Sequence, residues 1–359
     1  MNMQEPISTN TVNDNAGRGV RGLRARPSAE LFQALRDSYG INGLVDSRDL
    51  GGSSSLNLLV ADHHNRYVVR VFRPYLTEAR FTDYQLVRQA LNANGVPVPQ
   101  VLNTLDGQEY ILFDGRVVAV ERYMEHDAYM NSWEHLMTGF QLLGRIHTIL
   151  KDVPFGTEGK NPLFANYIEP QKTLSMTAQG AQRIRSWNLH AVNTRLADDA
   201  EKLAHMVSER EREYIAMLPQ QMVHGDYWDN NVLFRNDQIV LVNDFDFMGE
   251  RARIDDLALT LYYFSCSDAL VTDELLCRLR RLVDAYDQGL AEHLSVKERL
   301  ALPLAMARQP LWSIGGWVAL LDDEDAAQRH AQAMPADVDW ALRIMDDLER
   351  WQAAFADNA

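Results

Sequence analysis

The 359-residue sequence predicts an α+β protein in which a small antiparallel sheet with a helix precedes a larger, mainly helical part. Between residues 56 and 124, short apolar runs are separated by Asp-Gly and other polar turns, a pattern typical of β-hairpins. From Ser132 onward the spacing of the apolar residues changes from two to about 3.6, which indicates helices. The length is sufficient for two lobes and a sizeable buried core.

We expect residues 27–124 to form the first lobe, after a disordered tail. Residues 1–26 are rich in Asn, Gly and Arg, a composition that does not favour a packed core. A helix is predicted from Pro27 to Tyr39, because Ser28 can cap it and Gly40 can end it. The other elements predicted in this lobe are a helix at 82–92 and strands at 56–61, 67–72, 101–105, 109–113 and 117–124.

A Gly/Ser-rich stretch before the strand at 56–61 is a candidate phosphate-binding turn, because its backbone N–H groups can approach phosphate oxygens. Its candidate residues are Gly51, Gly52, Ser53 and Ser54. A flexible turn explains this composition by itself, but a base, Arg70, follows in the second strand of the adjacent hairpin. Val69 and Val71 share one face of that strand, so Arg70 points to the other face, where its guanidinium can pair with phosphate.

Residues 125–359 are expected to form the second, mainly helical lobe. Ser132 can cap a helix whose apolar stripe includes His147, which we interpret as a hydrogen-bonded core residue. Further helices are predicted at 177–187, 194–214, 273–293 and 335–355, and another starts at the capping box Ser295-x-x-Glu298. The acidic run 322–325 offers carboxylates to a cationic acceptor, but a solvated helix end is the preferred interpretation.

The net charge restricts the classes of partner. With 35 basic and 50 acidic residues, the chain carries a formal charge of −15, which argues against nucleic acid or an anionic membrane as partner. The acidity suits a cationic small substrate, and solubility explains it equally well. No apolar run has the length of a membrane span. Two cysteines form no disulfide framework, so we expect a cytoplasmic protein.

The stretch from residue 222 to residue 246 gathers polar residues around a predicted β-hairpin. Apolar runs at 232–234 and 239–242 flank a polar turn, and folding the hairpin brings Asn231 opposite Val242. Asp244 then lies at the same end as Asn231 and Asp226. Two oxygen ligands there suit Mg²⁺, and a third carboxylate can take a proton from a hydroxyl group. This arrangement is that of a phosphoryl-transfer site.

The pattern His224-x-Asp226-x4-Asn231, followed by Asp244-Phe245, resembles the catalytic and metal-binding loops of kinase-like folds. With Gly225, it is similar to the aminoglycoside phosphotransferase superfamily, which includes choline-type, homoserine-type and macrolide kinases. The resemblance implies a protein-kinase-like fold of two lobes and transfer of a γ-phosphoryl group from ATP or GTP to a small-molecule hydroxyl. It implies Asp226 as the base, and Asn231 and Asp244 as the Mg²⁺ ligands.

The same resemblance implies supporting roles in the second lobe. His224 would brace the loop near Asp244, and Asp246 would hold a second metal ion through water or brace the loop. Asp256, in Asp-Leu-Ala, would cap a helix and brace the active-site loops.

In the first lobe, the resemblance implies that backbone groups near Glu121 and Tyr123 would contact the adenine edge. Arg70 replaces the usual phosphate-binding Lys. The position of the helix Glu that pairs with this base holds Tyr84, and Glu78 is the nearby carboxylate that could replace it. We therefore expect the contacts that bind the nucleotide phosphates to differ from the usual pattern of the superfamily.

The acceptor and two other functional classes stay open at this stage. The acidity favours an aminoglycoside-like or amino-alcohol acceptor, and a homoserine-type or other hydroxylated metabolite is the alternative. Arg70 and Tyr84 raise the alternative of a nucleotide-binding pseudokinase, although Asp226, Asn231 and Asp244 are all present. His-x-Asp with Asp-x-Asp also fits a metal-dependent phosphohydrolase, but residues 222–262 contain no second histidine ligand.

Overall fold

A computed structural model describes residues 24–42, 46–52, 54–154, 156, 162, 164–187, 190–266 and 271–356. Nearly all of the predicted tail at 1–26, and Ser53 of the predicted phosphate-binding turn, lie outside these ranges. The chain divides into two compact units, one comprising Met1–Thr77 with Gln100–Tyr123 and the other Glu78–Pro99 with Met124–Ala359. Within the described ranges, no helix combines the length and the apolar character needed to cross a membrane.

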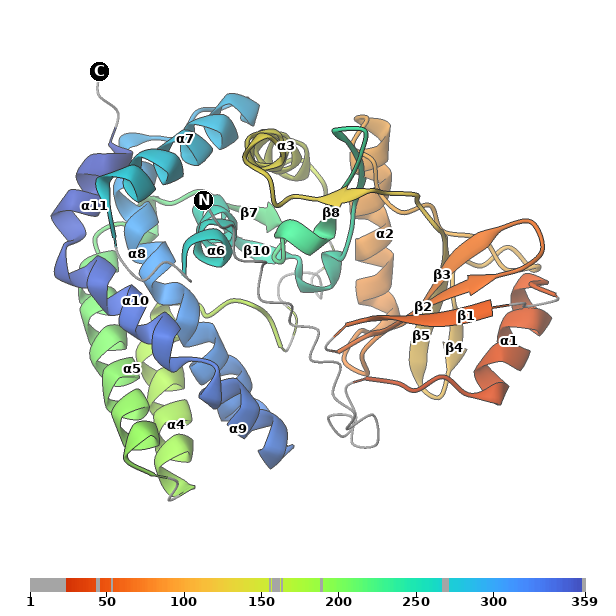
Figure 1. The fold of residues 1–359 in the computed structure, drawn as a ribbon, viewed down its shortest axis with the longest axis horizontal. Helices are drawn as coiled ribbons and strands as arrows, with labels where there is room; N and C mark the ends of the chain where they lie inside the picture. Colours follow the sequence, from red (N-terminus) through yellow and green to blue (C-terminus); the bar gives the residue numbers. More distant parts are fainter. Residues whose placement is uncertain are drawn as a thin grey trace. The chain divides into compact units, whose positions relative to one another are not determined.

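The first unit is an antiparallel sheet with one helix (Figure 1). Its described elements are α1 (Ala29–Tyr39), β1 (Asp46–Gly51), β2 (Leu56–Ala61), β3 (Arg66–Val71), β4 (Ile111–Phe113) and β5 (Arg116–Arg122). The strand order is β1-β2-β3-β5-β4. The predicted capping residues are confirmed, since Ser28 accepts a hydrogen bond from Leu31 N and Gly40 has a left-handed backbone, but the helix begins at Ala29 rather than at Pro27.

One strand prediction in this unit was wrong, and one strand was missed. The run 101–105 makes only an isolated bridge, Val101 with Glu121, because Thr104 is held in a tight local turn, where its N–H donates to Gln108 O and its hydroxyl accepts from Gln108 N. Strand β1 was not predicted, because all of its residues are exposed and it therefore shows no apolar alternation. The predicted hairpin of β2 and β3 is confirmed by its antiparallel pairing, in which Leu58 lies opposite Val69.

Helix α1 covers one face of this sheet. Leu31 and Leu35 of α1 belong to one buried apolar cluster with side chains of β2, β3 and β5, including Val69 and Val71. Alternation along β3 therefore places Arg70 on the opposite face, as predicted, in a row with its strand partners Asn57 and Ala119.

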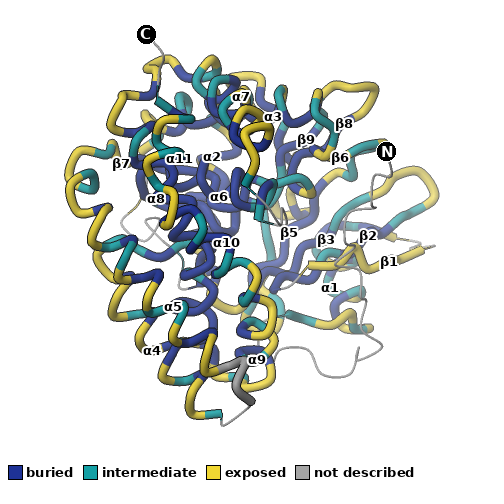
Figure 2. The backbone as a smooth tube through the Cα atoms, turned by 60° about the vertical axis from the view of Figure 1, so that its left-hand side comes forward, coloured by how far each residue is buried: buried dark blue, intermediate teal, exposed yellow. Residues whose placement is uncertain are grey.

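The second unit is mainly helical. Its described helices are α2 (Glu78–Ala93), α3 (Trp133–Leu150), α4 (Thr173–Ser186), α5 (His190–Glu211), α6 (Arg253–Ser265), α7 (Asp273–Gly289), α8 (Val296–Trp312), α9 (Glu324–Gln332), α10 (Pro335–Asp346) and α11 (Leu348–Phe355). Short helical turns lie at η2 (Pro170–Lys172), η3 (Ile215–Met217), η4 (Asp229–Asn231), η5 (Phe245–Phe247) and η6 (Ser313–Val318). Figure 2 shows α6 within the buried interior, whereas α4 and α5 present an exposed face.

Two small sheets carry the polar motif of this unit. Strands β7 (Gln220–Val223) and β10 (Gly249–Ala252) pair antiparallel, and β8 (Val232–Arg235) lies between β6 (Ala128–Tyr129) and β9 (Gln238–Val242). The predicted hairpin is confirmed, but its register differs by one residue, since Val232 lies opposite Val242 and Asn243 N donates to Asn231 O over 2.8 Å. The partner strands β6, β7 and β10 are too short for a periodic pattern and were missed.

Several caps were predicted correctly. Ser132 caps α3, and Ser295 with Glu298 forms the capping box of α8. The acidic run 322–325 forms the start of α9, where Asp323 accepts a hydrogen bond from Ala326 N over 2.9 Å and Glu324 lies 3.2 Å from Arg183. The preferred interpretation of this run as a helix end is confirmed.

A half-buried histidine makes the stability of the second unit depend on pH. His330 of α9 stacks on Trp317, with ring centroids 5.0 Å apart, and its burial, together with the charge of Arg329, lowers its pKa from 6.5 to about 4. Between pH 4 and pH 6.5 the imidazole of His330 is protonated in the unfolded chain but neutral in the folded chain. The contribution of His330 to the free energy of unfolding is therefore complete above pH 6.5 and decreases as the pH falls toward 4.

We expect His330→Gln to remove about 2 kcal/mol of the change in the free energy of unfolding between pH 7 and pH 5. Urea unfolding at pH 7 and pH 5 measures the difference for each chain. An unchanged pH dependence in the variant would show that other groups are responsible for it.

Candidate active site

The loop between β7 and β8 has a backbone conformation that only glycine adopts easily. Gly225 has a φ of +82°, and a Cβ atom there would overlap the carbonyl oxygen of Phe247. The neighbouring Tyr227 is fully buried, and its hydroxyl donates to Gly139 O of α3 over 2.8 Å. The backbone of the loop, residues 224–231, is therefore held by the close approach of Phe247 on one side and by the hydrogen bond of Tyr227 to α3 on the other.

The carboxylate of Asp256 holds the start of this loop. Its oxygens accept hydrogen bonds from the backbone N–H groups of His224 and Gly225, at 3.0 and 2.8 Å. His147 of α3 donates a third bond from Nε2, at 3.0 Å, while its Nδ1 lies 2.7 Å from the hydroxyl of Tyr286. Burial raises the pKa of Asp256, but the His147 hydrogen bond and nearby positive groups outweigh it, so the pKa lies below the usual range.

One part of the expectation for Asp256 was wrong, since this residue does not cap a helix. The N-cap of α6 is Ala252, and Asp256 lies within the first turn. Its carboxylate is directed to the 224–231 loop because that loop supplies two backbone donors. His147 is confirmed as a hydrogen-bonded core residue, with no exposed surface.

Asp226, the candidate base, is buried between two amide side chains. Asn166 Nδ2 donates to its Oδ1 over 2.7 Å, and Asn231 Nδ2 donates to its Oδ2 over 3.0 Å. Burial first, and then the negative charge of Asp244, raise the pKa of Asp226 well above its usual range, although both amide donors act in the opposite direction. The result is a fixed carboxylate that accepts a proton readily.

Asn166 was missed in the sequence because its segment has no periodicity and no recognisable motif. Arg308 of α8 places this segment by donating to Ile168 O over 2.7 Å. The Arg308 guanidinium also lies 3.0 Å from Glu211 of α5 and pairs with Asp255 of α6. A buried ion network that joins α5, α6 and α8 therefore positions the amide that contacts Asp226.

The oxygen atoms beside Asp226 are of the type that Mg²⁺ prefers. Both amide hydrogens of Asn231 are used by Asp226, since Nδ2 also donates to Asp226 O over 2.8 Å, which leaves the Oδ1 of Asn231 as the atom for a cation. Asp244 is close enough for its charge to raise the pKa of Asp226, and it has a left-handed backbone with a φ of 63°. A carboxylate and an amide oxygen thus fit a magnesium ion.

Both ring nitrogens of His224 form hydrogen bonds with backbone groups. Its Nε2 donates to Asn243 O over 2.9 Å, and its Nδ1 accepts from Asp226 N over 3.2 Å. Burial lowers the pKa of His224, which keeps the ring neutral and consistent with these bonds. Asp246 is buried in η5, immediately after the bend at Asp244.

The remaining predicted residues lie in the first unit. Gly51 and Gly52 have positive φ values, and the space at Gly52 is closed by Asn57 and Ser55. Ser54 is buried, and Gly51 is the last residue of β1 rather than part of a free turn.

The strand residues of this unit are placed as follows. Arg70 is buried in β3, and Glu121 is buried in β5 opposite Val68. Tyr123 directly follows β5, and its N–H donates to Arg66 O over 3.1 Å.

Tyr84, at the expected glutamate position of α2, packs within the second unit. Its ring centroid lies 5.8 Å from that of Phe245, in an edge-to-face arrangement, and 5.9 Å from that of Phe81. Helix α2 thereby presents an aromatic side chain to the residue that follows Asp244. Glu78 is exposed in the first turn of α2.

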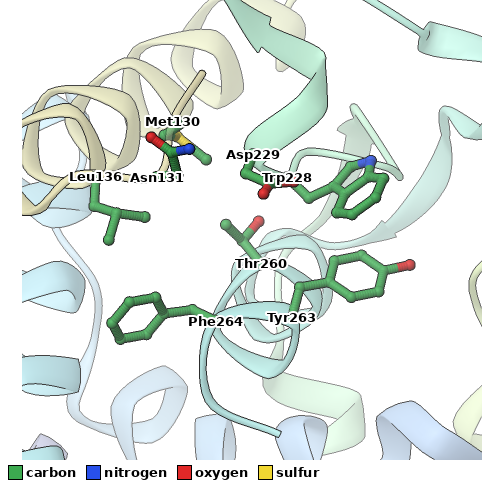
Figure 3. Close-up of a pocket in the computed structure, with 8 residues that line it drawn as sticks. All are labelled: Met130, Asn131, Leu136, Trp228, Asp229, Thr260, Tyr263 and Phe264. Carbon is green, nitrogen blue, oxygen red and sulfur yellow. The ribbon is translucent and has the colours of Figure 1, made fainter. Parts of the chain in front are cut away.

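A cavity of about 220 Å³ lies next to the 224–231 loop (Figure 3). It is lined by Met130, Asn131, Leu136, Trp228, Asp229, Thr260, Tyr263 and Phe264. Tyr263 connects this cavity to the candidate base, because its hydroxyl accepts a hydrogen bond from Asn166 over 3.3 Å. None of these residues was predicted from the sequence to line a cavity.

Comparison with known proteins gives matches over most of the chain. Residues 47–302 of this chain match the model of the phosphotransferase enzyme family. The homoserine kinase of Zymomonas mobilis subsp. mobilis is 23% identical over 261 residues, covering 70% of this chain and 73% of that protein.

Two solved structures show the same fold. A microcompartment-associated aminopropanol kinase has a TM-score of 0.66 at 18% identity and covers 89% of this chain and 98% of its own. An amicoumacin kinase in complex with AMP-PNP, Ca²⁺ and Ami has a TM-score of 0.64 at 13% identity and covers 90% of this chain and 94% of its own. The predicted kinase-like α+β fold is confirmed.

We expect Asp256→Asn to lower the free energy of unfolding by about 3–5 kcal/mol, because an amide cannot accept from all three donors and a buried group loses its partner. Urea unfolding measures this change. Asp339→Asn, at a half-exposed carboxylate of α10, is the matched control and should stay within about 0.5 kcal/mol of the wild type. Equal stability of the two variants would contradict a central role for Asp256.

Proposed function

The chain belongs to the phosphotransferase enzyme family, and we propose that it transfers the γ-phosphoryl group of ATP or GTP to a hydroxyl group of a small molecule. The observation that carries this proposal is the buried Asp226 carboxylate, which two amide groups hold beside Asp244. Phosphoryl transfer requires positioning and charge neutralisation more than covalent chemistry from the protein. A fixed proton acceptor next to oxygen ligands meets both requirements.

In this proposal Asp226 orients the acceptor hydroxyl and takes its proton as the new P–O bond forms. Its two oxygens are held by Asn166 and Asn231, which fixes the direction of the remaining lone pairs. The raised pKa of Asp226 increases its basicity toward the hydroxyl. Asn166 is thus a positioning residue, and His224 and Asp256 fix the backbone of the loop.

Asn231 and Asp244 would hold Mg²⁺, and Asp246 would hold a second ion through water or brace the bend. When bound, Mg²⁺ neutralises negative charge on the nucleotide phosphates. In the first unit, we propose that Gly51, Gly52, Ser53, Ser54 and Arg70 contact the phosphates, and that the backbone at Glu121 and Tyr123 contacts the base. The bidentate guanidinium of Arg70 supports its assignment.

The acceptor in this proposal carries a positive charge, as in an amino alcohol or an aminoglycoside-like compound. The net charge of −15 favours the approach of a cation. A homoserine-type acceptor is the second candidate, because the curated relatives include homoserine kinases at 23–24% identity.

We expect Asp226→Ala to lower the turnover number by at least about a hundredfold, as loss of a positioned base does. ADP release with Mg·ATP and a panel of alcohols measures turnover, and Asp339→Ala is the control with retained activity. Thermal unfolding of each variant shows whether the fold persists. Turnover near the wild-type rate in a folded Asp226→Ala protein would remove Asp226 as the base.

We expect Asp244→Ala to abolish the Mg²⁺-dependent activity, because the carboxylate ligand is lost. A titration with Mg²⁺ at saturating ATP and at saturating GTP measures the metal dependence and the nucleotide preference. Nucleotide binding without turnover of any alcohol, unaffected by Asp226→Ala, would indicate a pseudokinase. Phosphate release from phosphoesters without ATP would indicate a phosphohydrolase.

A further inference from the structure

We propose that Arg251 is a positioning residue for phosphoryl transfer. Its buried guanidinium group holds two parts of the chain in place, the segment 164–168, which carries Asn166, and the bend 245–248, which follows Asp244. This inference rests on the proposed function and deepens it, because it names a residue that would act on the reaction through Asn166 and Asp244.

The first observation is a buried cation that lacks an ion pair. Arg251 lies in β10, which pairs with β7 (Figure 1), and it is 1% exposed. Within the described part of the chain, its Nε has no hydrogen-bond partner, and its guanidinium forms no ion pair with a carboxylate. Arginine keeps its charge in proteins, and burial of an unpaired charge is costly. An apolar side chain would fill this space at lower cost, so stability alone does not account for the guanidinium.

The second observation is the contact of this guanidinium with the bend after Asp244. Nη2 of Arg251 donates to Phe247 O over 2.7 Å. The same carbonyl closes the space beside Gly225, where a Cβ atom would lie 2.0 Å from Phe247 O and 2.9 Å from Nη2 of Arg251. The guanidinium therefore lies against the start of the 224–231 loop and fixes the carbonyl group on which this loop packs.

The third observation is the contact of the guanidinium with the segment that carries Asn166. Cζ of Arg251 lies 4.4 Å from the ring centroid of Tyr167, and Cζ of Arg308 lies 5.7 Å from the same centroid. Aromatic rings attract cations most strongly where water is excluded. Because this segment has no helix or strand of its own, the contacts of the Tyr167 ring restrict the direction in which the neighbouring Asn166 donates to Asp226.

An aromatic contact joins the same two parts of the chain independently of Arg251. The ring centroid of Trp317 in η6 lies 5.3 Å from that of Phe164 and 6.3 Å from that of Phe247. The segment and the bend therefore share an apolar contact through Trp317 and a polar contact through Arg251. Since the apolar contact persists when Arg251 is replaced, a variant at this position tests the placement of the two parts rather than their folding.

The test is hydrogen exchange of the full chain, compared between the wild type and Arg251→Met. We expect backbone exchange to become at least about threefold faster in both the segment 164–168 and the bend 245–248, because both lose the guanidinium. Arg299→Met is the matched control, since Arg299 is also buried and pairs with two aspartates of α7 at 3.0 Å. Unchanged exchange in Arg251→Met, or the same acceleration in Arg299→Met, would overturn the proposal.

Variants of Tyr167 separate the placement of the segment from a general loosening of the fold. Tyr167→Leu removes the ring and should accelerate exchange in the segment 164–168 as Arg251→Met does, whereas Tyr167→Phe keeps the ring and should exchange as the wild type does. The double variant of Arg251→Met with Tyr167→Leu should show no further acceleration there, because both changes remove one contact. Additive effects, or a defect of equal size in Tyr167→Phe, would contradict this contact.

ADP release with Mg·ATP connects these contacts to phosphoryl transfer, with homoserine, kanamycin or water alone as the acceptor. We expect Arg251→Met to lower kcat by at least about tenfold for each acceptor that the wild type uses, and to change KM for ATP by less than about threefold. A wild-type kcat together with faster exchange would overturn the positioning role. Faster exchange in both parts, without turnover of any acceptor by the wild type, would support the contacts of Arg251 and reject the proposed function.

Discussion

The three hydrogen bonds of the Asp256 carboxylate hold together parts of the chain that are far apart in sequence. The donors are His147 of α3 and the backbone N–H groups of His224 and Gly225, and the acceptor belongs to α6. The carboxylate has no exposed surface, so each lost donor would leave a buried charge without compensation. The conformation of the 224–231 loop, and hence the position of Asp226, depends on this arrangement.

Asp226 depends equally on the side chains that contact it from other segments. Asn231 follows it by five residues, but Asn166 precedes it by sixty and is placed through Arg308 and its buried partners Glu211 and Asp255. Isolated buried ion pairs often contribute little net stability. Here the network gives a fixed position to a backbone segment that has no secondary structure of its own, which is a reason to keep charges in the interior.

The side chains of the 224–231 loop have two different surroundings. Asp226, Asn231 and Asp244 are brought together by the hairpin and by the bend at Asp244. Trp228 and Asp229 lie between Asp226 and Asn231 in the sequence, and their side chains line a cavity together with residues of α6 and of the start of α3. Residues that we propose for phosphoryl transfer and residues that line this cavity therefore belong to one short loop.

The sequence by itself determined the fold class, the caps of α1, α3 and α8, and the hairpin that brings Asn231 near Asp244, because these depend on local patterns of apolar and capping residues. It also indicated that Arg70 and the valines beside it occupy opposite faces of a strand. Only the tertiary structure revealed the exposed strand β1, the pairing of β7 with β10, the contact of Asn166 with Asp226 and the cavity at Asp229. Strand β1 is exposed throughout and therefore shows no apolar alternation. The other three features arise from contacts between distant segments, and such contacts leave no periodic signal in the chain.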